Sequence, residues 1–152
     1  LIREGAKRLG LANIEAKAHD ELQGFGEFPQ FERVLCDVPC SGFGVIRRKP
    51  EIRYKDLAGL KGLPALQLSI LGQGAQAVKP GGRLVYATCT LNPAENRQVA
   101  DAFLQAHPAF APAPFALPGA RRWAEEPSHM LTLLPFSGGS DGFFASVFQR
   151  RA

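Results

Sequence analysis

The stretch VLCDVPCSGFG, at Val34–Gly44, places an aspartate and a cysteine at and just beyond the end of an apolar run. The run itself, RVLCD at 33–37, is typical of a strand that is buried on both faces of a sheet. Proline, serine and glycine follow, and these residues favour a turn over a continued strand. Asp37 and Cys40 are therefore expected where a buried strand ends in a loop, which is where open α/β sheets bind their ligands.

A second stretch, LVYATCT at Leu84–Thr90, repeats this arrangement with Cys89. RLVYAT at 83–88 predicts another buried strand, and apolar residues at helical spacing predict a helix from Pro64 to Val78 between the two strands. Parallel strands joined by a helix end at the same edge of a sheet. If the two strands are neighbours, roughly 5 Å apart, Cys40 and Cys89 share one crevice at that edge.

The residues before the first stretch predict a helix, a strand and a loop. Residues 2–10 have a helical apolar pattern that Gly10 can end. NIEAKA at 13–18 predicts a short strand that closes on Asp20. Residues 20–31 hold two glycines and a proline, so they predict a loop.

The residues after the second stretch complete an α/β pattern. LNPAENRQVADAFLQA at 91–106 predicts a helix. Asn92 is its expected N-cap, and capping roles are expected for Glu95 and Asn96. The four prolines of residues 107–120 predict a connector without a helix or strand. Two antiparallel strands joined by a glycine-rich turn follow, HMLTLLP at 129–135 and GFFASVFQR at 142–150.

The order of these elements predicts the fold class. Strands and helices alternate along most of the chain, which is typical of an α/β protein. We expect an open, mostly parallel sheet with helices on both faces and a terminal antiparallel strand pair.

Composition and charge are those of one globular domain. The chain has 152 residues, 45% of them hydrophobic and 21% charged, and no apolar run approaches the roughly 18 to 20 residues of a membrane span. The three cysteines are an odd number and the first residues do not resemble a secretory signal, so we expect a reducing, cytoplasmic compartment. The net charge is +4. Charge alone favours a solvated loop where six basic residues gather: Arg47, Arg48, Lys49, Arg53, Lys55 and Lys61.

The cysteines have four alternative roles: metal ligands, a disulfide, core packing or chemistry. Zinc is disfavoured because Cys36 and Cys40 lack C-x2-C spacing and no histidine lies nearby. A reducing compartment disfavours a structural disulfide. Core packing suits Cys36, which lies inside the apolar run, but suits Cys40 less well because turn residues surround it. Cys89 follows a strand and precedes a helix entrance, an environment that suits a nucleophile.

VLCDVPCSGFGVIRRKPEIRY, at 34–54, resembles the D-x-P-C-S-G-x-G-x-x-R-x-x-P signature of RNA cytosine-5 methyltransferases of the Sun (Fmu) family. KPGGRLVYATCTLNPAEN, at 79–96, is similar to a second motif of that family, K-P-G-G-x-L-V-Y-x-T-C-S-x-x-x-x-E-N. LTLLPFSGGSDGFFASVFQR, at 131–150, is similar to the family's closing P-x-x-x-x-x-D-G-F-F-x-A segment. The resemblance extends from about Ala6 to the C-terminus. It implies the Rossmann-like sheet of class I methyltransferases and a likeness to the bacterial 16S ribosomal RNA enzymes.

The resemblance also implies roles for individual residues. In that family the T-C cysteine, here Cys89, attacks C6 of the target cytosine, and C5 then takes a methyl group from S-adenosylmethionine. The P-C cysteine, here Cys40, assists release of the product. Asp37 is expected to hydrogen-bond the cytosine edge and to lie against the methyl donor. Asp20 matches an acidic position that contacts the adenine end of the donor, with a helix or turn cap as its alternative role.

An RNA partner follows from the same resemblance. Arg47 and Arg48 match the family's basic segment, so a contact with the RNA backbone is favoured over simple solvation. Ribosomal RNA is the expected substrate and transfer RNA the alternative, and we expect a monomer without a membrane or metal partner. The DGFF motif is expected to be structural, with Asp141 in a turn and the phenylalanines in the core.

Methyltransferases of this fold hold the methyl donor on a glycine-rich loop after their first strand. None of the glycine clusters of this chain follows a first strand. We therefore expect residues 1–152 to be a single, partial catalytic domain, inactive alone, without the N-terminal strands, the donor loop and an N-terminal RNA-binding domain. The alternative is a non-catalytic RNA-binding or assembly module that retains the fold, against which the two cysteines argue. A redox protein is disfavoured because C-x-x-C spacing is absent.

Overall fold

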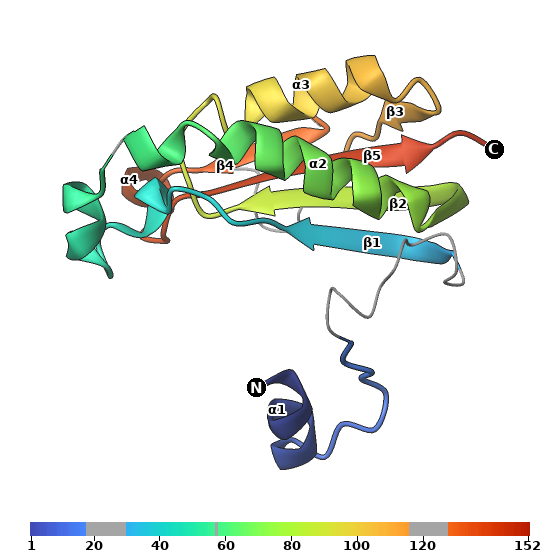
Figure 1. Cartoon of the computed structure of the whole chain (residues 1–152), viewed down its shortest axis with the longest axis horizontal. Helices are drawn as coiled ribbons and strands as arrows, with labels where there is room; N and C mark the ends of the chain where they lie inside the picture. Colours follow the sequence, from blue (N-terminus) through green and yellow to red (C-terminus); the bar gives the residue numbers. More distant parts are fainter. Residues whose placement is uncertain (18–29, 57, 116–127) are drawn as a thin grey trace.

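The computed structural model describes residues 1–17, 30–56, 58–115 and 128–152 (Figure 1). In these residues a five-stranded mixed sheet forms the centre of the fold. Its strands are β1 (Phe31–Asp37), β2 (Val78–Thr88), β3 (Phe110–Pro112), β4 (Met130–Leu133) and β5 (Phe143–Arg150). The α-helices of the described residues are α1 (Ile2–Arg8), α2 (Leu63–Gln76), α3 (Arg97–Ala106) and α4 (Pro135–Gly138). Short 3-10 helices lie between β1 and α2, namely η2 (Phe43–Val45), η3 (Pro50–Tyr54) and η4 (Ala58–Leu60).

The sheet has the order β1, β2, β5 and β3, and β4 pairs with β5 as well. β1 and β2 are parallel, and Asp37 lies opposite Ala87 at their ends. β5 runs antiparallel to β2 and also to β3 and β4. The predicted α/β class is confirmed, together with its terminal antiparallel pair, β4 and β5. The strands predicted at 33–37 and 83–88 are confirmed as parts of β1 and β2.

The core lies between the sheet and a layer formed by two helices, α2 and α3 (Figure 1). Alternate residues of β2 face these helices, because successive side chains of a strand point to opposite faces of the sheet. The largest fully buried apolar side chains of this core are Tyr86, Phe103, Phe148, Leu71 and Leu84. The rings of Phe103 and Phe148 lie 4.7 Å apart between their centroids, so α3 packs directly on β5.

The second face of β1 is not covered by the described residues. Cys36 faces α2 and is 8% exposed, whereas its neighbour Leu35 points to the other face and is 65% exposed. The predictions that 33–37 is buried on both faces, and that helices cover both faces of the sheet, are therefore wrong for the described residues. An apolar run shows that both faces of a strand are apolar, but not that each face has a partner.

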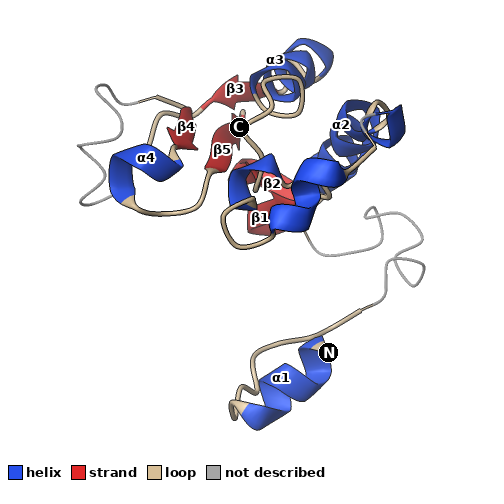
Figure 2. Ribbon diagram, turned by 90° about the vertical axis from the view of Figure 1, so that its left-hand side faces the viewer, coloured by secondary structure: helices blue, strands red, loops and turns tan. Residues whose placement is uncertain are grey.

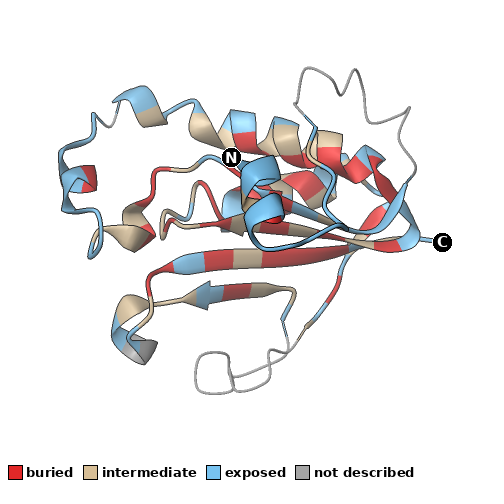
Figure 3. Cartoon of the chain, turned by 90° about the horizontal axis from the view of Figure 1, so that it is seen from below, coloured by how far each residue is buried: buried red, intermediate tan, exposed pale blue. Residues whose placement is uncertain are grey.

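α1 lies apart from the sheet in two views (Figures 1 and 2). It confirms the helix predicted at 2–10, and Gly10 follows it with a positive φ of 67°. Figure 3 shows that most of its residues are exposed, in contrast to the buried segments of the strands and of α2. The helix therefore adds little to the described core.

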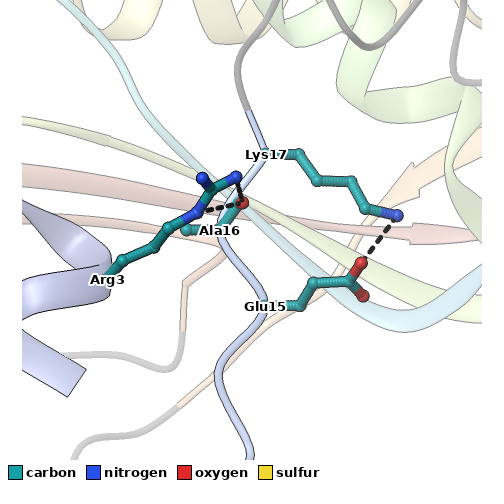
Figure 4. Close-up of polar contacts among 4 residues, drawn as sticks. All are labelled: Arg3, Glu15, Ala16 and Lys17. Atoms are coloured by element: carbon teal, nitrogen blue, oxygen red, sulfur yellow. Dashed lines mark hydrogen bonds and ion pairs between the residues drawn. The ribbon is translucent and has the colours of Figure 1, made fainter. Parts of the chain in front are cut away.

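The strand predicted at 13–18 is wrong for its described residues, 13–17, which do not form a strand. Arg3 of α1 instead donates two hydrogen bonds to the carbonyl oxygen of Ala16, at 2.9 and 3.3 Å (Figure 4). This contact ties the segment back to the helix and occupies a carbonyl group that strand pairing would use. Asp20 and most of the loop predicted at 20–31 lie outside the described residues.

The remaining elements confirm the predicted order but move its boundaries. The helix predicted from Pro64 to Val78 is α2, which ends at Gln76 because β2 begins two residues later. The helix predicted at 91–106 begins only at Arg97, as α3. The prediction that 107–120 is a connector without a helix or strand is wrong for its described residues, because they contain β3, which pairs with the last residues of β5. The glycine-rich turn between β4 and β5 contains the single turn of α4.

Candidate active site

β1 and β2 end side by side, and each leads into a loop that carries a cysteine. Val38 continues the pairing of the two strands by donating a backbone hydrogen bond to Ala87 at 3.2 Å. Figure 2 looks onto this end of the sheet, where short helices and α4 gather around the strand ends. The sulfur of Cys40 lies 3.3 Å from the sulfur of Cys89, in a partly buried contact. The structure therefore brings together the two cysteines that the strand order predicted to be neighbours.

Cys36 is separate from this pair and contributes to packing. It is 8% exposed and belongs to the core that α2 covers. A Cβ atom built on Gly74 of α2 would lie 2.5 Å from the Cys36 sulfur, so the helix approaches β1 closely here. Burial raises the pKa of Cys36 to about 11, which leaves it a neutral thiol at neutral pH. The packing role predicted for Cys36 is confirmed.

Cys40 is also a neutral thiol at neutral pH. Burial, followed by the hydrogen bond with the Cys89 side chain, raises the pKa of Cys40 to about 11. A protonated thiol is a poor nucleophile, but it can donate a hydrogen bond or a proton. Cys40 can therefore donate a hydrogen bond or a proton to a group beside it.

The loop after Cys40 is held between the Cys89 backbone and the residues that precede β5. The backbone N–H of Gly44 donates to the carbonyl oxygen of Cys89 at 3.0 Å, and that of Gly142 donates to Gly44 at 2.8 Å. A Cβ atom on Gly44 would lie 2.0 Å from the carbonyl oxygen of Gly142. Only glycine allows this approach of two backbone segments, so the second glycine of the first motif keeps the loop close to Cys89.

Arg47 and Arg48 extend from this loop to the residues before β5. The Nη2 atom of Arg47 donates to the carbonyl oxygen of Gly139 at 3.0 Å, and Nε of Arg48 forms an ion pair of 2.6 Å with Asp141. Both arginines are exposed, whereas the Asp141 side chain is only 6% exposed. These contacts tie the cysteine loop to the start of β5, and an RNA contact of the two arginines stays a prediction.

Glu95 lies between the two cysteine loops with 1% of its surface exposed. Its Oε2 atom accepts hydrogen bonds from the backbone N–H of Ser41 at 2.8 Å and from the side-chain amide of Gln67 at 3.0 Å. Its Oε1 atom accepts a hydrogen bond from the side-chain amide of Asn92 at 2.9 Å. Burial acts to raise the pKa of Glu95, but the hydrogen bonds from these three residues outweigh it and lower the pKa below its ordinary value. Glu95 is therefore a buried carboxylate anion held by N–H donors.

Hydroxyl groups form a second link between the two cysteine loops. The hydroxyl oxygens of Ser41 and Thr90, both 0% exposed, lie 2.6 Å apart. Thr88 donates to the amide oxygen of Asn96 at 2.7 Å, and the Asn96 amide donates to the backbone of Thr90 at 2.9 Å. Asn96 precedes the first residue of α3 but makes no side-chain cap. The capping roles predicted for Glu95 and Asn96 are therefore wrong, because both side chains hold the cysteine loops.

Sequence reasoning missed four buried polar residues of this site: Ser41, Gln67, Thr88 and Thr90. Gln67 left a signal, because it is a polar residue one turn before Leu71 on the buried side of α2. A buried polar side chain on an otherwise apolar helix face requires a hydrogen-bond partner. The hydroxyl residues left no comparable signal, because small polar residues are common in loops whatever their role.

The family described as 16S rRNA methyltransferase RsmB/F matches this sequence over residues 1–149. The chain belongs to the RsmB/F family. It is 43% identical over 159 residues to the probable ribosomal RNA small subunit methyltransferase B of Bacillus subtilis. It is 37% identical over 153 residues to ribosomal RNA small subunit methyltransferase B of Vibrio cholerae. Each match covers 99% of this chain but only 35% and 33% of the two relatives, so the chain spans about a third of their length.

Solved structures support the fold of this RsmB/F family member. PH0851 matches it with a TM-score of 0.86 at 27% identity, over 98% of this chain and 34% of that protein. A methyltransferase homologue from Pyrococcus horikoshii matches with a TM-score of 0.73 at 29% identity, over 97% of this chain and 48% of that protein. NSun6 from the same organism, solved with SFG, matches with a TM-score of 0.76 at 21% identity, over 99% of this chain and 38% of that protein. At this identity the match supports the fold alone. The family resemblance seen in the three motifs is confirmed.

Asp37 ends β1 at the same edge of the sheet as the two cysteines of this RsmB/F chain. It is exposed, and its carboxylate has no hydrogen bond or ion pair with the described residues. No described residue occupies the carboxylate oxygens, which can accept hydrogen bonds from a bound molecule. Asp20, the other acidic residue predicted at the methyl donor, lies outside the described residues.

Among residues 1–17, 30–56, 58–115 and 128–152, no group of three or more His, Cys, Asp or Glu side chains could hold a metal ion. No helix within those ranges has the length and apolar character needed to cross a membrane.

Proposed function

We propose that this chain supplies the cysteine-bearing part of an S-adenosylmethionine-dependent RNA cytosine-5 methyltransferase. The observation that carries the proposal is the 3.3 Å contact between the sulfurs of Cys40 and Cys89 at the ends of two parallel strands. Membership of a 16S rRNA methyltransferase family, and the names of the relatives, support ribosomal RNA as the substrate. The free cysteines agree with a reducing compartment, so we place the enzyme in the cytoplasm.

Cys89 acts as the nucleophile in this proposal. Its thiolate adds to C6 of the target cytosine and forms a carbon–sulfur bond, and the electron pair of the 5,6 double bond moves into the ring. C5 thereby becomes nucleophilic enough to accept a methyl group. After a water molecule has accepted the proton of C5, the carbon–sulfur bond breaks, the double bond forms again and Cys89 leaves with the electron pair.

Cys40 assists the last of these steps. It lies 3.3 Å from the sulfur that leaves C6, so it is close enough to donate its proton to that sulfur. Its pKa of about 11, raised first by burial, means that the proton is still on Cys40 at neutral pH. A general acid must carry its proton at the working pH, and Cys40 meets this condition.

Among the described residues, Asp37 is proposed to contact both the methyl donor and the target cytosine. Its exposed carboxylate can accept hydrogen bonds, and both the amino acid part of S-adenosylmethionine and the cytosine edge carry N–H donors. S-adenosylmethionine, when bound, supplies the methyl group that C5 accepts. Asp20 is proposed to contact the adenine end of the donor. The chain spans about a third of the length of its relatives, so we propose that it forms a partial catalytic domain that is inactive alone.

The basic residues after the first motif are proposed to contact RNA phosphates. Arg47 and Arg48 are exposed although each has one intramolecular contact, and their neighbours Lys49 and Arg53 are exposed as well. A guanidinium group has five N–H donors, so one such contact leaves donors for phosphate oxygens. The net charge of +4 favours the same partner.

Transfer of a labelled methyl group to 16S rRNA by the complete natural protein tests this function. We expect Cys89→Ala to abolish transfer, and Cys40→Ala to accumulate a covalent protein–RNA adduct that survives a denaturing gel. Cys36→Ala is the matched control and should retain transfer, because Cys36 contributes only to packing. Transfer by Cys89→Ala would overturn the assignment. RNA binding without any transfer by the natural protein would point instead to the non-catalytic module.

A further inference from the structure

Glu95 joins three segments that are distant in the sequence. Its carboxylate accepts the backbone N–H of Ser41, the residue that follows the first cysteine of the site, at 2.8 Å. It also accepts the side-chain amides of Gln67, from α2, at 3.0 Å and of Asn92, in the loop of the second cysteine, at 2.9 Å. One carboxylate thus binds both cysteine loops and the helix that connects the two strands.

Stability alone does not account for a carboxylate at this position. Glu95 is 1% exposed, and it takes part in none of the ion pairs of the described residues. Hydrogen bonds to a charged acceptor stabilise the anion and offset the cost of removing it from water. Buried ionic groups are nonetheless often no more stabilising than apolar side chains of the same size. The contacts that Glu95 makes point to a role in geometry.

These contacts hold the backbone on both sides of Cys40. Glu95 binds the N–H of Ser41 on one side. The side-chain amide of Gln67, which is itself bound to Glu95, donates to the carbonyl oxygen of Pro39 on the other side at 2.9 Å. A loop that is held at both neighbours of a residue leaves that residue little freedom to move. The position of the Cys40 sulfur therefore depends on Glu95.

We propose that Glu95 is a positioning residue that sets the distance between the sulfurs of Cys40 and Cys89. Its effect on methyl transfer rests on the proposed function, because the reaction belongs to that proposal. Its effect on geometry does not, because the two sulfurs can react with each other in the absence of RNA. The two effects can therefore be measured separately.

Glu95→Gln tests this role with almost no change in side-chain size. The carboxylate offers two acceptor oxygens, whereas an amide offers one acceptor oxygen and an NH2 donor. Whichever way the amide is turned, its NH2 group faces at least one of the N–H groups that the carboxylate now binds. At least one contact is lost, so the Cys40 loop is held less firmly and the sulfurs spend less time together.

Two rates in the complete natural protein report the effect. Diamide accepts two hydrogen atoms from a pair of thiols and leaves a disulfide. We expect the rate at which the Cys40–Cys89 disulfide forms, followed by peptide mapping, to fall threefold or more in Glu95→Gln. The kcat for methyl transfer to 16S rRNA should fall tenfold or more while the KM for RNA stays unchanged, because the variant alters the geometry of the reacting groups and not the RNA contacts.

Two control variants distinguish the loss of the Glu95 contacts from the loss of a negative charge and from a loss of protein stability. Glu32→Gln removes an exposed carboxylate that pairs with Lys79, and it should leave both rates unchanged. Phe103→Leu weakens the core in α3, where the buried ring of Phe103 packs on Phe148. At a comparable loss of stability it should leave the rate of disulfide formation unchanged. An equal slowing in Phe103→Leu and Glu95→Gln would overturn the positioning role.

The outcomes distinguish this proposal from the proposed function. Disulfide formation at the natural rate in Glu95→Gln overturns the positioning role, even where the natural protein methylates RNA. Slower disulfide formation in Glu95→Gln supports the positioning role, even where the natural protein transfers no methyl group and the proposed function therefore fails.

Discussion

The sulfur of Cys40 lies 3.3 Å from the sulfur of Cys89, although 49 positions separate the two residues in the sequence. The parallel pairing of β1 and β2 brings their loops to the same edge of the sheet. Polar side chains then join the loops, through the carboxylate of Glu95 and through the hydroxyl pair of Ser41 and Thr90. The chemistry that we propose thus depends on two loops that are held in register by buried polar contacts.

A mild oxidant is expected to join Cys40 and Cys89 in the folded protein. The two sulfurs are already in contact, so only a small movement separates them from bonding distance, which is about 2.0 Å in a disulfide. After diamide treatment, peptide mapping should find the Cys40–Cys89 disulfide, and methyl transfer should fall to background. A thiol reductant should restore both the free thiols and the activity.

Cys36 provides the control for this oxidation. It is buried in the core beneath α2, so it should stay a free thiol in the folded protein, and Cys36→Ala should form the same disulfide. A disulfide that includes Cys36 would contradict the separation of Cys36 from the pair.

The strands and the cysteine contact are predictable from the sequence. β1 and β2 are each an apolar run that ends in turn residues, and a helix separates them, so a parallel pairing is the favoured arrangement. Cys40 and Cys89 follow the ends of these strands, and their contact results from that pairing. The exposure of Leu35 is not predictable, because an apolar residue has the same appearance in a sequence whether or not its face is covered.

The polar contacts beneath the cysteines are beyond sequence reasoning for a different reason. The spacing of Asn92 and Glu95 is that of a helix capping box. In the structure Asn92 does accept the N–H of Ala94 at 3.2 Å, but the Glu95 carboxylate turns to Ser41. The same local spacing serves both arrangements. Glu95 binds Ser41 and not the helix N-terminus because a loop distant in the sequence supplies the N–H group of Ser41. This is an effect of the tertiary structure, which local spacing does not reveal.

The stability of the fold is expected to fall as the pH rises above 9. Burial raises the pKa of Cys36 from 9.0 to about 11, so the native state favours the neutral thiol. This stabilisation is fully present below pH 9 and is lost as the pH rises toward 11, because the unfolded state then ionises first. At pH 10 we expect the titration of Cys36 alone to lower the free energy of unfolding by about 1 to 2 kcal/mol relative to pH 8, measured by urea denaturation.

Cys36→Ala separates this effect from the titration of Cys40, whose pKa burial also raises to about 11. The variant is less stable at every pH, but its stability should fall less steeply between pH 8 and pH 10. Burial also raises the pKa of Tyr86 above its ordinary value of 10.0, so Tyr86 lowers the stability as the pH approaches 10, but it does so equally in both proteins. An equal slope in both proteins would show that Cys36 is not the group that titrates.

Gly74→Ala should destabilise the protein because α2 and β1 approach each other closely. The new Cβ atom would lie 2.5 Å from the Cys36 sulfur, whereas its next neighbours, at 3.6 Å and 3.7 Å, are at ordinary contact distance. Overpacking of this kind costs about 1 to 3 kcal/mol. The helix propensity of alanine offsets about 1 kcal/mol of that cost. Urea denaturation should show a net loss, with the site chemistry unchanged because Cys36 lies outside the cysteine pair.

The same substitution in a Cys36→Ala background identifies the cause. Without the sulfur the new methyl group has room, so Gly74→Ala should be neutral or stabilising there, and the double-mutant cycle should show a coupling of about 1 kcal/mol or more. Gly59→Ala is the matched control, since a Cβ atom at that position meets nothing within 4 Å. An unchanged cost of Gly74→Ala in both backgrounds would mean that something other than the Cys36 sulfur requires glycine at this position of α2.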